Sequence, residues 1–146
     1  MTCKSRHFQC YNHCNNSLEL LEYRAKEYHI EIKNNPHQLI YCDATLIEQV
    51  IINLLLNAFE ASPINSKITI RSSNDEYANI IEIIDQGCGI KTKDLSKVTE
   101  LFYSTKYHGT GLGLSICSQI IQQHDGSLTF QNNELGTTVR IELPRF

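Results

Sequence analysis

Two asparagines one helical turn apart are the first residues in this sequence whose spacing suggests chemistry. Asn53 and Asn57 lie in the apolar run Val50–Ala58, which is predicted to form a largely buried helix. A buried amide without hydrogen bonds costs about 1 to 3 kcal/mol, so two amides on one line of this helix suggest an opening toward a polar ligand. These residues alone leave a second interpretation open, in which both amides bond to neighbouring backbone.

A second group follows an apolar stretch that is predicted to be a strand. Asp85 ends this strand and is followed by Gly87, Gly89 and Ile90. A carboxylate at this position can accept a hydrogen bond from an exocyclic amine, and the glycines allow backbone to approach a flat base or a phosphate closely. The alternative is an ordinary glycine turn that Asp85 caps.

A third group is a glycine-rich run that leads directly into a predicted helix: Gly109, Thr110, Gly111, Leu112, Gly113 and Leu114. Free backbone N–H groups at a helix start, with the positive end of the helix dipole, suit an anion such as a polyphosphate. The spacing is neither that of a P-loop nor that of a dinucleotide fold. Just upstream, Lys106 would supply a mobile positive charge, although on its own it reads as a solvated surface lysine.

Length and composition place these motifs in one globular domain. The chain has 146 residues, 41% of them hydrophobic and 20% charged, with 13 basic and 16 acidic side chains. The net charge of −3 leaves no broad basic face for nucleic acid. No run of about 18 consecutive apolar residues and no apolar leader is present, which predicts a soluble, cytoplasmic protein. The six cysteines form no CxxC pair and are expected to be free thiols.

The first half of the chain is predicted to contain two helices and two short strands. Residues 1–16 lack apolar periodicity and are expected to form a poorly ordered leader, with the domain at residues 17–146. A helix at Leu18–Ala25 precedes strands at His29–Lys33 and Gln38–Cys42, which we expect to pair as a hairpin. A long helix is then predicted from an N-cap at Asp43 to about Ala61, where Pro63 stops it.

The second half adds two hairpins around a long loop and one helix. Strands are predicted at Lys67–Ser73 and Ala78–Asp85, and again at Ser127–Gln131 and Thr137–Leu143. Between the two pairs, Gln86–Gly111 is expected to form a ligand-covering lid. The last helix is expected at Leu112–His124, ended by Gly126. This order predicts an α+β, two-layer sandwich: one mixed, mostly antiparallel sheet with helices on one face.

The motifs in this order strongly resemble those of a known family. An Asn-x-x-x-Asn helix, a D-x-G-x-G turn, an aromatic-Ser-Thr-Lys segment ending at Lys106, and a G-x-G-x-G helix start are typical of the ATP-binding catalytic domain of bacterial sensor histidine kinases. This domain is a member of the GHKL, or Bergerat-fold, superfamily. The resemblance covers about Leu18 to Pro144, including the closing Gly136-Thr137-Thr138-Val139, and is closest to the nitrogen-regulation type.

The resemblance implies a role for each motif in binding ATP and Mg²⁺. Asn57 would coordinate the Mg²⁺ that bridges the phosphates, with the assistance of Asn53. Asp85 would bind the adenine amino group, directly and through a water shared with Thr137. Further contacts are implied for two sets of residues: Gly87, Gly89 and Ile90 along the base and sugar, and Lys106 with the backbone of Gly109, Thr110, Gly111 and Gly113 around the phosphates, where Leu112 and Leu114 close the lid helix.

The resemblance also separates kinase from hydrolase. Relatives that hydrolyse ATP carry a glutamate general base four residues before the metal-binding asparagine, and that position is Asn53 here. Because an amide cannot accept a proton from water at neutral pH, transfer of the γ-phosphoryl group to an outside acceptor is favoured.

None of the six histidines lies in the phosphoacceptor motif of the family. The chain therefore resembles the catalytic half of a kinase that phosphorylates a histidine on a separate dimerisation domain, in cis or in trans. This kinase would act indirectly on a response regulator, and the isolated domain is expected to be monomeric. The alternative is a module that sequesters a partner, as anti-sigma factors of the superfamily do, without histidine transfer.

Overall fold

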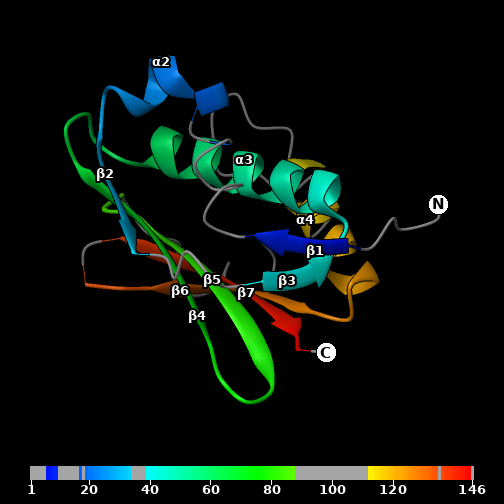
Figure 1. Ribbon diagram of the computed structural model, residues 1–146. Helices are drawn as coiled ribbons and strands as arrows, with labels where there is room; N and C mark the ends of the chain where they lie inside the picture. Colours follow the sequence, from blue (N-terminus) through cyan, green and yellow to red (C-terminus); the bar gives the residue numbers. More distant parts are fainter. Residues whose placement is uncertain are drawn as a thin grey trace.

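Five strands form one mixed sheet, and helices α3 and α4 cover one of its faces (Figure 1). The computed structural model describes residues 6–9, 17, 19–33, 39–87, 112–134 and 136–145. In the order β2-β4-β5-β7-β6, the strands are His29–Lys33, Lys67–Asn74, Ala78–Ile84, Thr137–Pro144 and Ser127–Asn132. Only the β2–β4 pair of this sheet is parallel. The predicted two-layer architecture is therefore confirmed.

The two hairpins predicted from local alternation are both present. β4 pairs with β5 and β6 pairs with β7, and the two hairpins join along β5 and β7. Ile70 lies opposite Ile83 on β4–β5, and Ile83 lies opposite Val139 where the hairpins join. These side chains are buried on the helix-covered face. On the opposite face, Arg71 forms an ion pair with Glu82 at 2.9 Å. One face of the sheet thus packs against the core and the other carries charged side chains, as is usual for alternating antiparallel strands.

The expected hairpin between the predicted strands His29–Lys33 and Gln38–Cys42 is wrong. β2 pairs in parallel with β4, whereas β3 (Leu39–Cys42) pairs with β1 (Arg6–Gln9) in a separate two-stranded sheet. A parallel pair needs a long crossover, and the segment between β2 and β4, which includes α3, supplies one. Local turn residues between β2 and β3 carry no information about such a distant partner. β1 also lies in the segment where no element was predicted.

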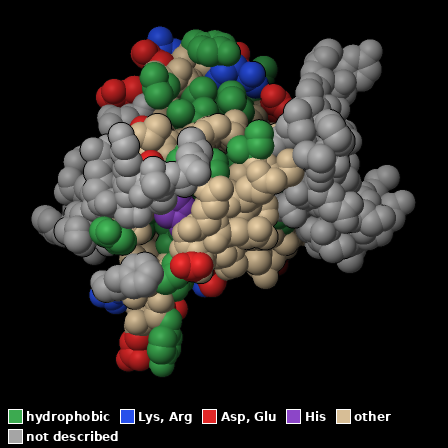
Figure 2. Space-filling model, turned by 90° about the vertical axis from the view of Figure 1, so that its right-hand side faces the viewer, with side chains coloured by type: hydrophobic (Ala, Val, Ile, Leu, Met, Phe, Trp, Pro, Cys, Tyr) green, Lys and Arg blue, Asp and Glu red, His purple; other side chains and the backbone are tan. Residues whose placement is uncertain are grey.

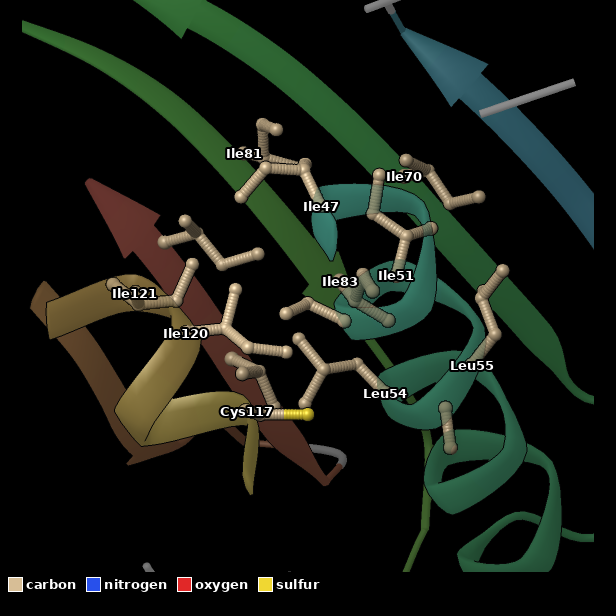
Figure 3. Packing of buried hydrophobic residues seen from close by; sticks show 14 of the residues in the cluster. Ile47, Ile51, Leu54, Leu55, Ile70, Ile81, Ile83, Cys117, Ile120 and Ile121 are labelled. Carbon is tan, nitrogen blue, oxygen red and sulfur yellow. The ribbon is translucent and has the colours of Figure 1, made fainter. Parts of the chain in front are cut away.

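Helix α3 (Ala44–Ala61) is the central element of the core and has the predicted bounds. The carboxylate of Asp43 caps it by accepting the N–H of Leu46 at 3.2 Å. Figure 3 shows Ile47, Ile51 and Leu54 directed toward the isoleucines of β4 and β5 and toward α4. Within the described residues, α3 is the one helix long and apolar enough to cross a membrane, and here its apolar side chains belong to the core.

Helix α2 (Glu22–Ala25) lies within the predicted Leu18–Ala25 helix, and the turn after it docks on the C-terminal end of α3. The ring of Tyr28 stacks on that of Phe59 with centroids 4.9 Å apart. The Tyr28 hydroxyl donates to the Phe59 carbonyl at 2.6 Å, and this carbonyl near the helix end also accepts the Ser62 N–H at 3.3 Å.

Helix α4 (Leu112–Gln123) ends near the predicted residue. The residue with left-handed backbone after it is Asp125, and not the glycine that was expected to end the helix. Asp125 has a φ of 57°, and the N–H of Gly126 donates to the Ile121 carbonyl at 3.0 Å, as in a Schellman motif. Gly126 is required for another reason: a Cβ there would lie 2.3 Å from the carbonyl oxygen of Glu142. The glycine therefore permits close packing of the helix end on β7.

Charged side chains of both signs are interspersed on the surface. On the face shown in Figure 2, basic and acidic side chains lie together at the upper end, with apolar side chains among them. At the lower end, where the β4–β5 hairpin ends, acidic and apolar side chains meet. Tyr77, in the turn between β4 and β5, is 80% exposed.

Candidate nucleotide-binding site

Asp85 and Thr137 lie side by side at one end of the sheet, where β5 ends and β7 begins. The backbone N–H of Thr137 donates to Oδ1 of Asp85 at 3.1 Å, and the N–H of Asp85 donates to the Thr137 carbonyl at 2.9 Å. The N–H of Gly87 also donates to the same oxygen at 2.9 Å. Only 5% of Asp85 is exposed, so its carboxylate is a buried acceptor held by two backbone donors.

Gly136 is a residue of this site that the sequence analysis quoted but did not assign. A Cβ at this position would lie 2.5 Å from the Asp85 carbonyl oxygen, 2.5 Å from the Gly87 nitrogen and 2.7 Å from Oδ1 of Asp85. Asn133 holds the preceding turn by accepting the Gly136 N–H at 2.6 Å. Only glycine fits here, and the Gly-Thr pair in the closing motif was the available signal.

The end of β5 also contacts the helix that carries the two asparagines. A Cβ on Gly87 would lie 2.5 Å from the carbonyl oxygen of Ala61. Asn53, Asn57 and Ala61 follow one another at four-residue intervals, which places them on one line of α3. The side chains of Asn53 and Asn57 are half-buried. The Asp85 group therefore lies at the end of the asparagine line, as the predicted site requires.

Helix α4 runs antiparallel to α3, which places its first turn near the same line. At one end, His124 after α4 contacts Asp43 before α3. Seven residues earlier in α4, the Cys117 thiol hydrogen-bonds to the side chain of Asn53. From this register we expect the start of α4, with Gly113 and the half-buried Leu114, to lie on the side of Asn57. Among the described residues, a Cβ on Gly113 would meet nothing within 4 Å outside its own helix backbone.

Cys117 lies between these two helices as a neutral thiol. It is fully buried, and Figure 3 shows its sulfur directed toward Leu54 of α3. Burial raises the pKa of Cys117 to about 11, although the hydrogen bond with Asn53 acts in the opposite direction. Because its charged form is disfavoured, this cysteine packs as a small apolar residue.

Part of the predicted site lies outside the described residues: Gly89, Ile90, Lys106, Gly109, Thr110 and Gly111. Of the expected lid, the structure describes Gln86 and Gly87, and of Leu112 it describes the backbone. The described part of the chain contains no group of three His, Cys, Asp or Glu side chains that would hold a metal ion by themselves.

Comparisons with known proteins show the family to which the chain belongs. Residues 42–146 match the family described as "Histidine kinase-, DNA gyrase B-, and HSP90-like ATPase". The chain belongs to this family. Among curated relatives, sporulation kinase B of Bacillus subtilis is 39% identical over 117 residues, which cover 79% of this chain. WalK of the same organism is 37% identical over 82% of this chain and is a sensor histidine kinase.

Solved structures show the same relationship. The catalytic domain of histidine kinase ThkA, in a nucleotide-free form, superimposes with a TM-score of 0.90 at 31% identity, covering 97% of both chains. The chain is thus a catalytic ATP-binding domain of the histidine kinase type. The expected nitrogen-regulation type is not supported, because the relatives are sporulation kinases and the sensor kinases WalK and ZraS.

The match is to a domain. The chain spans about a quarter of the length of sporulation kinase B (27%) and of WalK (22%).

Proposed function

We propose that this histidine kinase domain binds Mg·ATP between α3 and the β5–β7 edge and transfers the γ-phosphoryl group to a histidine on a separate dimerisation domain. The observation that carries the proposal is the placement of Asp85 and Thr137 at the end of the Asn53–Asn57–Ala61 line. This arrangement offers one ligand a buried carboxylate at one end and amide side chains at the other.

Asp85 is suited to recognise adenine. Its carboxylate can accept from the exocyclic amino group, and the backbone N–H groups of Thr137 and Gly87 keep it oriented. Gly136 and Gly87 let the ends of β5, β7 and α3 approach one another closely around Asp85, which helps to fix the position of its carboxylate. The shared water with Thr137 and the contacts of Gly89 and Ile90 remain part of the proposal.

Asn57, with Asn53 beside it, is suited to hold a Mg²⁺ ion that arrives with the phosphates. Mg²⁺ prefers oxygen ligands and is usually bound through one or two protein ligands together with substrate phosphates. A half-buried amide oxygen fits that requirement, and the described residues offer no acidic cluster that would bind the ion without nucleotide. When bound, the ion neutralises charge on the phosphates.

The phosphates would lie toward the first turn of α4. No described residue crowds the Cβ position of Gly113, and helix starts favour anions. Lys106, Gly109, Thr110 and Gly111 would complete the contacts, with Leu112 and Leu114 closing the helix. Hydrolysing relatives carry a glutamate general base at the position of Asn53. Because the amide of Asn53 cannot accept a proton from water, transfer to an acceptor is favoured over hydrolysis.

The proposed partners are the phosphoacceptor domain and, indirectly, a response regulator. In one solved structure, ThkA is in complex with the response regulator TrrA; this chain matches 42% of that ThkA chain with a TM-score of 0.87. We propose a cytoplasmic location for the domain, where such partners would meet it.

The test mixes the chain with Mg·[γ-³²P]ATP and a purified helical-hairpin acceptor domain from a related kinase. We expect acid-labile phosphohistidine on the acceptor and negligible label on this chain. Asn57→Ala should abolish transfer, whereas Gln49→Ala, an exposed change on the same helix, should leave it intact. Tight binding to the acceptor without transfer, or stable label on this chain alone, would overturn the proposal.

A further inference from the structure

His124, the residue after α4, joins the last turn of α4 to Asp43, the N-cap residue of α3. Its Nε2 lies 3.0 Å from the backbone nitrogen of Asp43, and its Nδ1 lies 2.8 Å from the carbonyl oxygen of Ile120. The first contact crosses 81 positions of sequence, and the second lies within the last turn of α4. The half-buried imidazole therefore bridges two helix ends.

The two partners determine which nitrogen carries the proton. A backbone N–H can only donate, so Nε2 must accept from Asp43. A backbone carbonyl can only accept, so Nδ1 must donate to Ile120. Both contacts are made only by a neutral ring with its proton on Nδ1, since an imidazolium would direct a second N–H at the N–H of Asp43.

Each contact supplies a group that a helix end lacks. In a capping box, a Glu or Gln at the third helical position reaches back to the N–H of the N-cap residue. That position of α3 is Leu46, which has no acceptor, and His124 supplies the acceptor from another helix. At the end of α4, the same ring satisfies the carbonyl of Ile120, one of those that every helix end leaves unpaired.

We propose that His124 is a positioning residue that fixes α4 against α3 and thereby sets the spacing between Asn57 and the start of α4. This inference rests on the proposed function, since these two elements would hold the Mg²⁺ and phosphate part of ATP. The adenine part, at Asp85 and Thr137, is built on β5 and β7 and does not depend on the His124 contact. Loss of His124 should therefore weaken the binding of ATP but not of adenosine.

The first experiment is long-range ¹H–¹⁵N NMR of the full chain at about pH 8, where an ordinary histidine is neutral. The His124 ring is assigned by the signals that disappear in His124→Phe, and His29, whose side chain is exposed on β2, serves as a reference. We expect a protonated Nδ1 and an unprotonated Nε2 for His124. A proton on Nε2, or rapid averaging as for an exposed ring, would overturn the proposal.

The second experiment compares dissociation constants for Mg·ATP and adenosine by calorimetry. His124→Phe keeps a ring but removes both nitrogens, and it should weaken ATP binding at least about fivefold with adenosine unchanged. His124→Gln keeps one acceptor and one donor and should recover most of the affinity. Equal loss in both variants, or parallel loss of adenosine, would overturn the positioning role. A wild-type chain that bound neither ligand would overturn both the proposed function and the role of His124.

Discussion

The carboxylate of Asp85 accepts a hydrogen bond from the backbone N–H of Thr137 at 3.1 Å, across 52 positions of the sequence. The Asp85 backbone donates back to the Thr137 carbonyl at 2.9 Å, so each strand end holds the other. The orientation of the carboxylate is thus determined by the sheet itself before any ligand binds. Preorganisation of this kind lowers the cost of ordering a binding group and makes the site sensitive to small changes.

Asp85→Asn should weaken adenosine binding by about 1 to 3 kcal/mol, because a charge-assisted hydrogen bond to the adenine amino group is replaced by a weaker one or by a donor. Titration calorimetry measures this loss directly. Glu82→Gln makes the same acid-to-amide change on the same strand, but on the opposite face where Glu82 pairs with Arg71, and should leave binding unchanged. Equal adenosine affinity in the Asp85 variant would show that the adenine assignment is wrong.

Gly136→Ala should destabilise the fold and disrupt the site together. The added Cβ would lie 2.5 Å from the Asp85 carbonyl and the Gly87 nitrogen, so the two strand ends must separate. Overpacking of this kind costs about 1 to 3 kcal/mol of unfolding free energy, which urea denaturation measures. Adenosine binding should fall in parallel. Unchanged stability would mean that the strand ends are not in the contact described.

Gly113→Ala should separate stability from function at the start of α4. No atom of the described residues outside the helix's own backbone lies within 4 Å of the new Cβ, and alanine favours helix more than glycine, so stability should stay constant or rise by up to about 1 kcal/mol. If the backbone of Gly113 approaches phosphates, the methyl group should nevertheless weaken ATP binding and spare adenosine. Calorimetry with both ligands tests this, and ATP affinity equal to wild type would remove Gly113 from the proposed site.

The elements that depend on neighbouring residues were predictable from the sequence. Alternation in β4–β5 and β6–β7, the N-cap at Asp43 and the stop at Pro63 are local signals, and each identifies an element that the structure contains. The line of Asn53 and Asn57 follows from helical spacing alone. Pairing that depends on distant segments was not predictable in this way, which is why β3 was assigned to β2 and not to β1.

The packing around the site carried still weaker sequence signals. The contact of His124 with Asp43 joins residues that flank two different helices. The local sequence around one residue does not identify the other as its partner. The requirement for glycine at position 136 comes from the close approach of Asp85 and Gly87, which exists only once β5 and β7 are paired. Motif order located the site, and tertiary packing determined which neighbouring residues support it.

Cys117 should give the fold a specific loss of stability in alkali. Its pKa is raised to about 11 in the folded state by burial, against 9.0 for the reference thiol, so the unfolded chain loses this proton at lower pH. The contribution of Cys117 is complete below about pH 9 and declines as the pH rises toward 11, by up to about 2 to 3 kcal/mol. Urea denaturation of wild type and Cys117→Ala at intervals between pH 8 and about pH 11 isolates this term, because the other titrating groups are common to both proteins. The alanine variant should be less stable at pH 8, where a buried sulfur has been removed, and the difference should narrow with rising pH. A constant difference across this range would show that the thiol ionises equally in both states, which a buried position between α3 and α4 does not allow.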